Sequence, residues 1–178
     1  NYVNIKDKLN DCHNENKRSR ELIADQITKN EVVFYKQYKP SIETTMHALT
    51  NTYTIHVHAI QFNRISAMEN CKEIIKEMFT NYCFIEYFTP GIDVALEIKK
   101  KYNKENIIFL KNHGIVFTHE NIDTLKTIIN NALTKLENYL KLSLENYKFV
   151  NTISQYMKNI NKHSYFSYLS EDYIIYNY

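Results

Sequence analysis

The sequence predicts an α/β domain with a mixed or antiparallel sheet, because strand-like and helix-like segments interleave along the chain. Short apolar, β-branched runs alternate with segments whose apolar residues recur every three or four positions. The runs at residues 107–110 and 115–118 are joined by a tight turn that contains glycine, which is typical of a hairpin. No internal repeat or low-complexity linker marks a second domain, so the 178 residues are interpreted as a single domain.

The first part of the chain is predicted to alternate between strands and helices. Strands are expected at residues 2–5, 53–60 and 83–88, and a brief apolar run occupies residues 32–35. Helices are expected from about residue 40 onward, at 67–81, at 89–102 and at 15–29, where a connecting segment is the alternative. Ser41 is a suitable N-cap for the helix that starts near residue 40, because Ile42, Met46 and Leu49 follow at helical spacing.

The later part of the chain contains the longest predicted helix, which runs from a cap at Asn121 or Thr118 to about residue 144. Its apolar stripe is expected to face inward and consists of Ile122, Leu125, Ile128, Ile129, Leu133, Leu136 and Leu140. We interpret residues 1–39 as a divergent lead-in, residues 40–144 as the core and residues 145–178 as a helical tail.

The composition is that of an ordinary globular protein, with 44% hydrophobic and 24% charged residues and a net charge of +2. The small net charge and the single lysine triplet, at residues 99–101, predict no nucleic-acid partner. No apolar run reaches the ~18 residues of a membrane helix, so no membrane association is expected. Cys12, Cys71 and Cys83 lack the regular spacing of a disulfide framework, which favours a reducing compartment, and we expect the cytoplasm.

The most informative motif is a pair of histidines, His56 and His58, inside an apolar and β-branched run. Side chains alternate along a strand, so these two imidazoles point to the same side. Two neighbouring imidazoles would repel each other if both were charged, and a shared metal ion keeps both neutral. The alternative is a pair of strand histidines that face solvent or make hydrogen bonds.

Other candidate groups occur at the edges of predicted elements. Glu43 lies in the first turn of a predicted helix, where it acts either as a metal ligand or general base, or simply favours the helix dipole. His113 lies in the hairpin turn, as a further ligand or as a packed turn residue beside Gly114. Gly114 can adopt a positive φ and allows a close approach of the chain to another group. His47, four residues after Glu43 on the same helix face, is a candidate to support the site.

Four segments together resemble the class II aldolase/adducin family, in order and in spacing. They are PSIETTMH at residues 40–47, IHVHA at 55–59, YFTPG at 87–91 and FLKNHGIV at 109–116. The resemblance covers about residues 40–140 and implies a three-layer α/β/α fold with a mixed, mainly antiparallel central sheet. It also implies that His56, His58 and His113 are zinc ligands and that Glu43 is the catalytic acid/base. His47, Asn112 and Gly114 would support these groups.

The resemblance implies a zinc-dependent lyase of carbohydrate metabolism. Such an enzyme cleaves a sugar phosphate through a metal-stabilised enediolate, and it commonly forms a homotetramer. The alternatives within the family are an epimerase, a dehydratase and a non-catalytic, adducin-like interaction module. The phosphate loops of the family contain glycine upstream of the Glu43 motif, whereas Gly91 is the first glycine here. We therefore expect an N-terminally incomplete domain, in which the residues that bind the substrate phosphate stay unassigned. The resemblance also implies a tyrosine that acts as an acid toward the leaving aldehyde, and this tyrosine stays unassigned as well.

Overall fold

The computed structural model describes residues 5, 8–9, 16–31 and 40–141 of the chain. Its helices are α1 (Lys17–Asn30), α2 (Thr44–His47), α3 (Ile60–Ser66), α4 (Cys71–Met78), α5 (Ile92–Lys101) and α6 (Ile122–Leu140). Its strands are β1 (Tyr53–Val57), β2 (Cys83–Ile85), β3 (Ile107–Leu110) and β4 (Gly114–His119). The expectations for residues 2–4, 32–35 and 145–178 lie outside the described residues.

The four described strands form one sheet in the order β1-β4-β3-β2. β1 pairs with β4 and β3 pairs with β4, both antiparallel, whereas β2 and β3 are parallel. The predicted hairpin is the β3–β4 pair, which is closed by Leu110 opposite Gly114. The mixed, mainly antiparallel sheet expected from the sequence is therefore confirmed.

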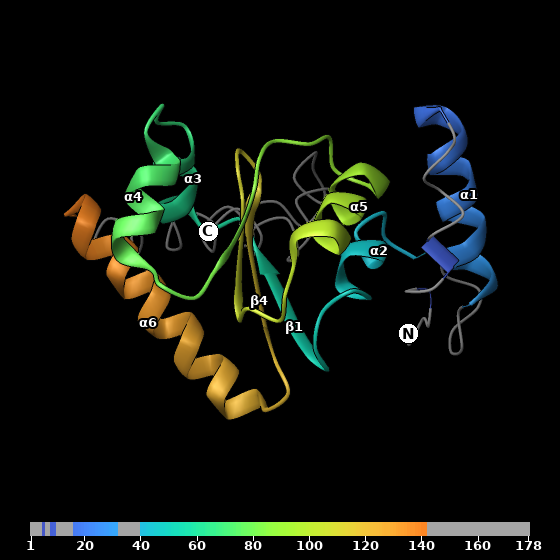
Figure 1. The fold of residues 1–178 in the computed structure, drawn as a ribbon. Helices are drawn as coiled ribbons and strands as arrows, with labels where there is room; N and C mark the ends of the chain where they lie inside the picture. The colour runs from blue at the N-terminus through green and yellow to red at the C-terminus, as the bar shows by residue number, and fades with distance from the viewer. Residues whose placement is uncertain (1–4, 6–7, 10–15, 32–39, 142–178) are drawn as a thin grey trace, which may run out of the picture.

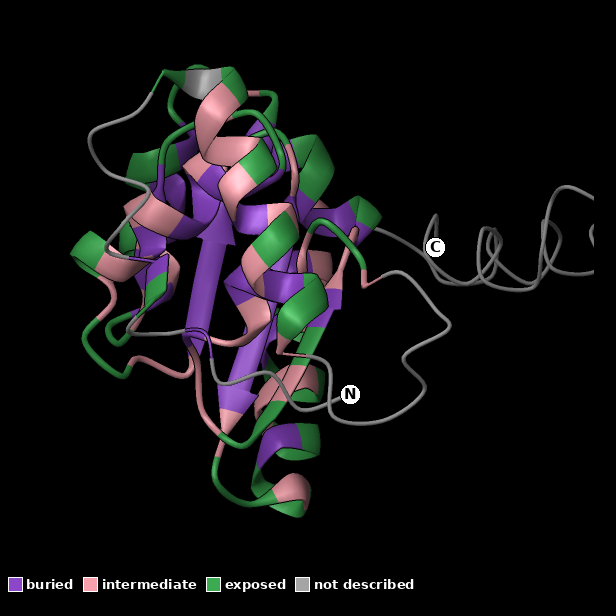
Figure 2. Cartoon of the chain, turned by 90° about the vertical axis from the view of Figure 1, so that its right-hand side faces the viewer, coloured by how far each residue is buried: buried purple, intermediate pink, exposed green. Residues whose placement is uncertain are grey.

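The sheet lies between two layers of helices, with α3, α4 and α6 on one face and α1, α2 and α5 on the other (Figure 1). Alternation along β3 explains the two layers, because Ile108 and Leu110 join one apolar cluster and Ile107 and Phe109 join the other. The central strands β3 and β4 are almost wholly buried (Figure 2), whereas the edge strand β1 exposes Tyr53 and Ile55. The α/β/α prediction is confirmed.

Several element bounds differ from the sequence-based expectations. The strand predicted to reach residue 60 ends at Val57, and a helix that was not predicted, α3, begins at Ile60. The pairing of β1 with β4 stops at Val57 opposite Ile115, and the chain beyond it turns so that Phe62 and Ile65 reach the core. The start of α3 was not predicted because Ile60 is β-branched and follows an apolar, β-branched run, so it was interpreted as the end of the strand.

The helix expected from residue 40 is only the single turn α2. Of the three apolar residues at helical spacing, Met46 and Leu49 are buried, whereas Ile42 lies before the turn and is 59% exposed. The predicted N-cap at Ser41 is wrong, because the residue at the N-cap position of α2 is Glu43. Ser41 lies two residues before it, and its Oγ accepts the backbone N–H of Glu43 at 3.2 Å. This bond holds Glu43 at the start of the helix.

The remaining helices are close to their predicted positions but shorter. The helix expected at 67–81 is α4, and the one expected at 89–102 is α5. The lysine triplet lies in the last turn of α5, where the helix dipole favours positive charge. The Asn121 cap of α6 is confirmed, since its Oδ1 accepts the backbone N–H groups of Asp123 at 3.0 Å and Thr124 at 2.9 Å. α6 ends at Leu140 rather than near residue 144, with Lys141 in the left-handed region at φ 51°.

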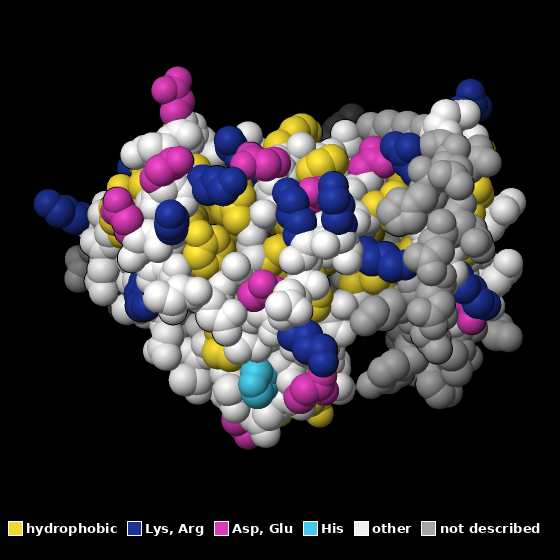
Figure 3. Space-filling model, viewed as in Figure 1, with side chains coloured by type: hydrophobic (Ala, Val, Ile, Leu, Met, Phe, Trp, Pro, Cys, Tyr) yellow, Lys and Arg dark blue, Asp and Glu magenta, His cyan; other side chains and the backbone are white. Residues whose placement is uncertain are grey.

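Charged side chains of both signs are interspersed on the face drawn in Figure 3. Glu86, for example, lies between Lys72 at 3.7 Å and Lys111 at 3.6 Å. No helix among the described residues is both long enough and apolar enough to cross a membrane.

The centre of one core layer is Phe109, and its truncation is expected to destabilise the domain by about 3–5 kcal/mol. Its ring is fully buried and lies 5.0 Å from the ring centroids of both Phe62 and Phe79. Urea denaturation of Phe109→Ala measures this loss, and Tyr87→Ala, at a 57% exposed position, is the control with little change. A loss below about 1 kcal/mol for Phe109→Ala contradicts the packing described here.

Candidate metal centre

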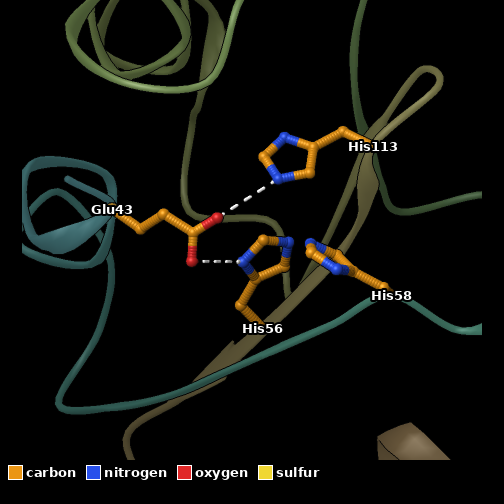
Figure 4. Close-up of side chains that lie close together, drawn as sticks. All are labelled: Glu43, His56, His58 and His113. Atoms are coloured by element: carbon orange, nitrogen blue, oxygen red, sulfur yellow. Dashed lines mark hydrogen bonds and ion pairs between the residues drawn. The ribbon is translucent and has the colours of Figure 1, made fainter. Parts of the chain in front are cut away.

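Four side chains from three separate segments meet at one end of the sheet (Figure 4). Glu43 immediately precedes α2, His56 lies on β1, His58 follows that strand, and His113 lies in the turn between β3 and β4. One ligand atom from each of these residues lies within 4.8 Å of the others. The tertiary fold therefore brings together the four residues that the sequence singled out, from positions up to seventy residues apart.

The three imidazoles form a compact triangle. The ring centroids of His56 and His58 are 4.8 Å apart, those of His56 and His113 are 4.9 Å apart, and those of His58 and His113 are 5.1 Å apart. His56 lies on β1, whereas His58, which was expected on the same strand, lies just beyond its end, and the two rings are nevertheless neighbours. The β4–β1 pairing places the turn with the third beside them, because Val57 lies opposite Ile115.

Glu43 joins two of the imidazoles. Its Oε2 lies 3.3 Å from Nδ1 of His56, and its Oε1 lies 3.2 Å from Nε2 of His113. These hydrogen bonds hold the pKa of Glu43 far below the usual value for a carboxyl group, and the bond to His113 has the larger effect. Burial acts in the opposite direction and raises the pKa. The side chain is therefore an ionised carboxylate next to the histidine triangle.

Three ring nitrogens in the triangle lack a hydrogen-bond partner among the described residues. Nε2 of His56, Nε2 of His58 and Nδ1 of His113 are all buried. A buried polar nitrogen without a partner is costly, and a metal ion in contact with the two Nε2 atoms would remove that cost for them. The pKa of His58 is lowered mainly by burial and, to a smaller extent, by the neighbouring His56 and His113. The lowered pKa favours the neutral imidazole, which is the form that binds metals. The donor set thus fits a divalent metal ion.

The comparison with known proteins decides the family. The sequence profile of the class II aldolase and adducin N-terminal domain matches residues 12–139. The chain belongs to the class II aldolase and adducin family. The family whose profile matches includes aldolases, which are enzymes. No curated protein matches the sequence.

Similar solved structures include a domain from Thermoplasma acidophilum and YgbL from Klebsiella pneumoniae. The N-terminal class II aldolase domain of a conserved protein from Thermoplasma acidophilum has a TM-score of 0.67 at 21% identity. That match covers 78% of this chain and 65% of the Thermoplasma chain, so this chain spans just under two thirds of it. YgbL from Klebsiella pneumoniae has a TM-score of 0.47 at 21% identity and covers 59% of this chain and 58% of the other. The Thermoplasma match supports the class II aldolase fold.

At Gly114, the β3–β4 turn of this class II aldolase domain comes close to the segment that carries His56 and His58. A Cβ atom at this position would lie 2.6 Å from the carbonyl oxygen of Val57, 2.8 Å from Cδ2 of His58 and 2.9 Å from Nε2 of His56. The close approach expected at this glycine is therefore present. The positive φ expected there is wrong, because the described glycine with positive φ is Gly91, and Asn112 takes the left-handed position in the turn, at φ 54°.

The other two candidates for support lie at different distances from the cluster. The ring of His47 is centred 6.1 Å from that of His56, and its pKa is lowered by burial first and then by His56. His47 is adjacent to the four-residue cluster and is not a member of it. Asn112 is exposed and makes its hydrogen bonds with Ser66. The sequence did not point to Ser66, because Ser66 lies at the end of α3, the helix that was not predicted.

Proposed function

We propose that this domain binds a divalent metal ion, zinc, and acts as a carbon–carbon lyase on a sugar phosphate. The observation that carries the proposal is the convergence of three histidines and an ionised carboxylate, with three buried ring nitrogens that lack partners among the described residues. His56, His58 and His113 would hold the metal, and a three-histidine set leaves a coordination position open for substrate. We also propose a homotetramer, as the family resemblance implies, and a cytoplasmic location, which the spacing of the cysteines favours.

The chemistry divides between the metal and the chain. When bound, the metal supplies a Lewis acid for the substrate carbonyl group. When the neighbouring carbon–carbon bond breaks, the hydroxyl group on the leaving carbon loses its proton and becomes the aldehyde carbonyl, and the bonding electron pair stays on the other carbon. We assign both proton transfers to Glu43, which as a carboxylate accepts the hydroxyl proton and then returns it to the carbon that holds the electron pair. Glu43 suits this role because it is ionised, adjoins the histidine triangle and keeps 29% of its side chain exposed.

The substrate class follows from the resemblance of the four sequence motifs to zinc-dependent sugar-phosphate aldolases. An epimerase or a dehydratase of the same family would use the same histidine cluster. A non-catalytic, adducin-like module would lack turnover altogether. The products therefore discriminate among these functions, and metal content tests the site itself.

The metal content of the purified chain, after reconstitution with zinc, is expected to be about one ion per chain. Elemental mass spectrometry measures the number of metal ions per chain. His58→Ala removes a ligand and is expected to reduce the content below about 0.1 per chain after removal of weakly bound metal. His119→Gln is the matched control, since it removes an imidazole that lies outside the cluster, at the opposite end of β4 from Gly114. Less than about 0.1 ion per chain in the unmodified protein rejects the site.

Turnover is tested on a panel of ketose 1-phosphates, with aldehyde release followed by proton NMR. The expected result is metal-dependent cleavage of at least one substrate. Formation of an epimer or a dehydrated product instead supports the corresponding family activity. A chain that binds metal but transforms none of the panel favours the interaction module.

A further inference from the structure

Helix α3 lies between the two segments that carry the proposed metal ligands. It begins at Ile60, directly after the segment that contains His58, and ends at Ser66. Ser66 is 1% exposed and reaches the β3–β4 turn, which carries His113. One short helix therefore contacts both parts of the site.

At its C-terminal end, α3 is attached to the turn by two hydrogen bonds to one residue. The backbone N–H of Asn112 donates to Oγ of Ser66, and that hydroxyl lies 3.2 Å from Oδ1 of Asn112, to which it can donate. The hydroxyl thus acts as both acceptor and donor, which fixes its orientation. Asn112 is in the left-handed region at φ 54°, a conformation that asparagine tolerates better than most residues.

The side chains of the turn also contact Glu43, through His113, and Glu86, through Lys111, whereas its backbone makes few other hydrogen bonds among the described residues. The backbone N–H of His113 donates to the carbonyl of Leu110 at 3.0 Å, and that of Lys111 donates to the carbonyl of Ile85 at 3.0 Å. Both bonds hold the strand side of the turn. The bonds to Ser66 are the ones that connect its exposed tip, at Asn112, to the body of the domain.

At its N-terminal end, α3 is connected to the other ligand segment. Nδ2 of Asn63 lies 3.4 Å from the carbonyl oxygen of His58, a long hydrogen bond from the helix back to the residue that precedes it by five positions. The backbone N–H of Asn63 donates to the carbonyl of Ala59 at 2.9 Å, which begins the helix immediately after the histidine segment.

We propose that Ser66 is a positioning residue for the metal centre. Its bonds with Asn112 hold the β3–β4 turn so that His113 faces His56 and His58, and α3 sets the separation of the two ligand segments. The proposal rests on the proposed function, because it gives the positioning a purpose. Groups that orient metal ligands typically change metal affinity by about 10- to 100-fold when they are removed.

The test measures the affinity of the full chain for Co²⁺ by its visible absorption spectrum. Ser66→Ala is expected to weaken binding by about 10- to 100-fold. Asn112→Gly, which keeps access to a positive φ and removes only the side-chain acceptor, is expected to weaken it in the same direction. The double variant should be little worse than Ser66→Ala alone, because both changes break one contact.

The matched control is Thr28→Ala. Thr28 is also buried, at 5% exposure, and its hydroxyl donates to the carbonyl of Ala24 at 2.6 Å, but it lies on α1 away from the cluster. This control is expected to lose stability in denaturation without a change in Co²⁺ affinity. An effect of Ser66→Ala that merely reflects general destabilisation would appear in Thr28→Ala as well.

A second readout needs no metal. The ring nitrogen resonances of His113, recorded by NMR on the metal-free chain, are expected to shift in Ser66→Ala and in Asn112→Gly but not in Thr28→Ala. If the unmodified chain binds Co²⁺ and both turn variants stay within about twofold of it, the positioning role is overturned and the proposed function stands. If the unmodified chain binds no Co²⁺, the proposed function fails, and the His113 resonances decide the positioning role: unchanged resonances overturn it and shifted ones support it.

Discussion

Glu43→Gln is expected to lower the rate of aldehyde release by about 10²- to 10⁴-fold while the metal stays bound. The amide has nearly the shape of the carboxylate, so the three histidines keep their positions. It cannot accept and return a proton, because it lacks the ionised form that the bonds to His113 and His56 maintain. Steady-state rates and metal content, measured on the same preparation, separate the two effects.

The control for this substitution is Asp123→Asn. It makes the same chemical change at an 81% exposed carboxylate in the first turn of α6, and it should leave the rate unchanged. Glu43→Ala should resemble Glu43→Gln in rate and should also retain the metal. Undiminished turnover in Glu43→Gln would remove Glu43 from the mechanism. Loss of metal together with turnover would make Glu43 a ligand instead.

Gly114→Ala is expected to abolish tight metal binding and to cost about 1–3 kcal/mol in unfolding free energy. The added Cβ would lie under 3.0 Å from the Val57 carbonyl oxygen and from atoms of both His56 and His58. Relief of these contacts requires the turn to move away from β1, and His113, which adjoins Gly114, moves with it. Metal mass spectrometry and urea denaturation provide the two measurements.

The matched control is Gly91→Ala. This glycine has φ 124°, and its added Cβ would lie 2.7 Å from Oε1 of Glu21, so the substitution is also strained. Gly91 is outside the histidine cluster, however, and the variant should keep its metal. If Gly114→Ala retains a full complement of metal, then the close approach of the turn to β1 is not needed for the site.

The fold class was predictable because its signals are local. The β3–β4 hairpin and the long helix α6 follow from apolar runs, a turn and a cap at Asn121 that occupy neighbouring positions in the sequence. The end of β1 was not predictable in the same way. It is set where its pairing with β4 stops, and Ile60 by itself fits a strand as well as it fits the first turn of α3.

The candidate site shows the same division. The sequence by itself determined the family, through four ordered motifs, and the chemical nature of the four clustered residues. Only the tertiary structure decided that Glu43 lies between His56 and His113, which are 13 and 70 residues away along the chain. It also decided that Ile42 is exposed and that Ser66 reaches Asn112. Contacts between distant residues depend on how strands pair and helices pack, whereas residue type and local spacing report only on neighbours in the chain.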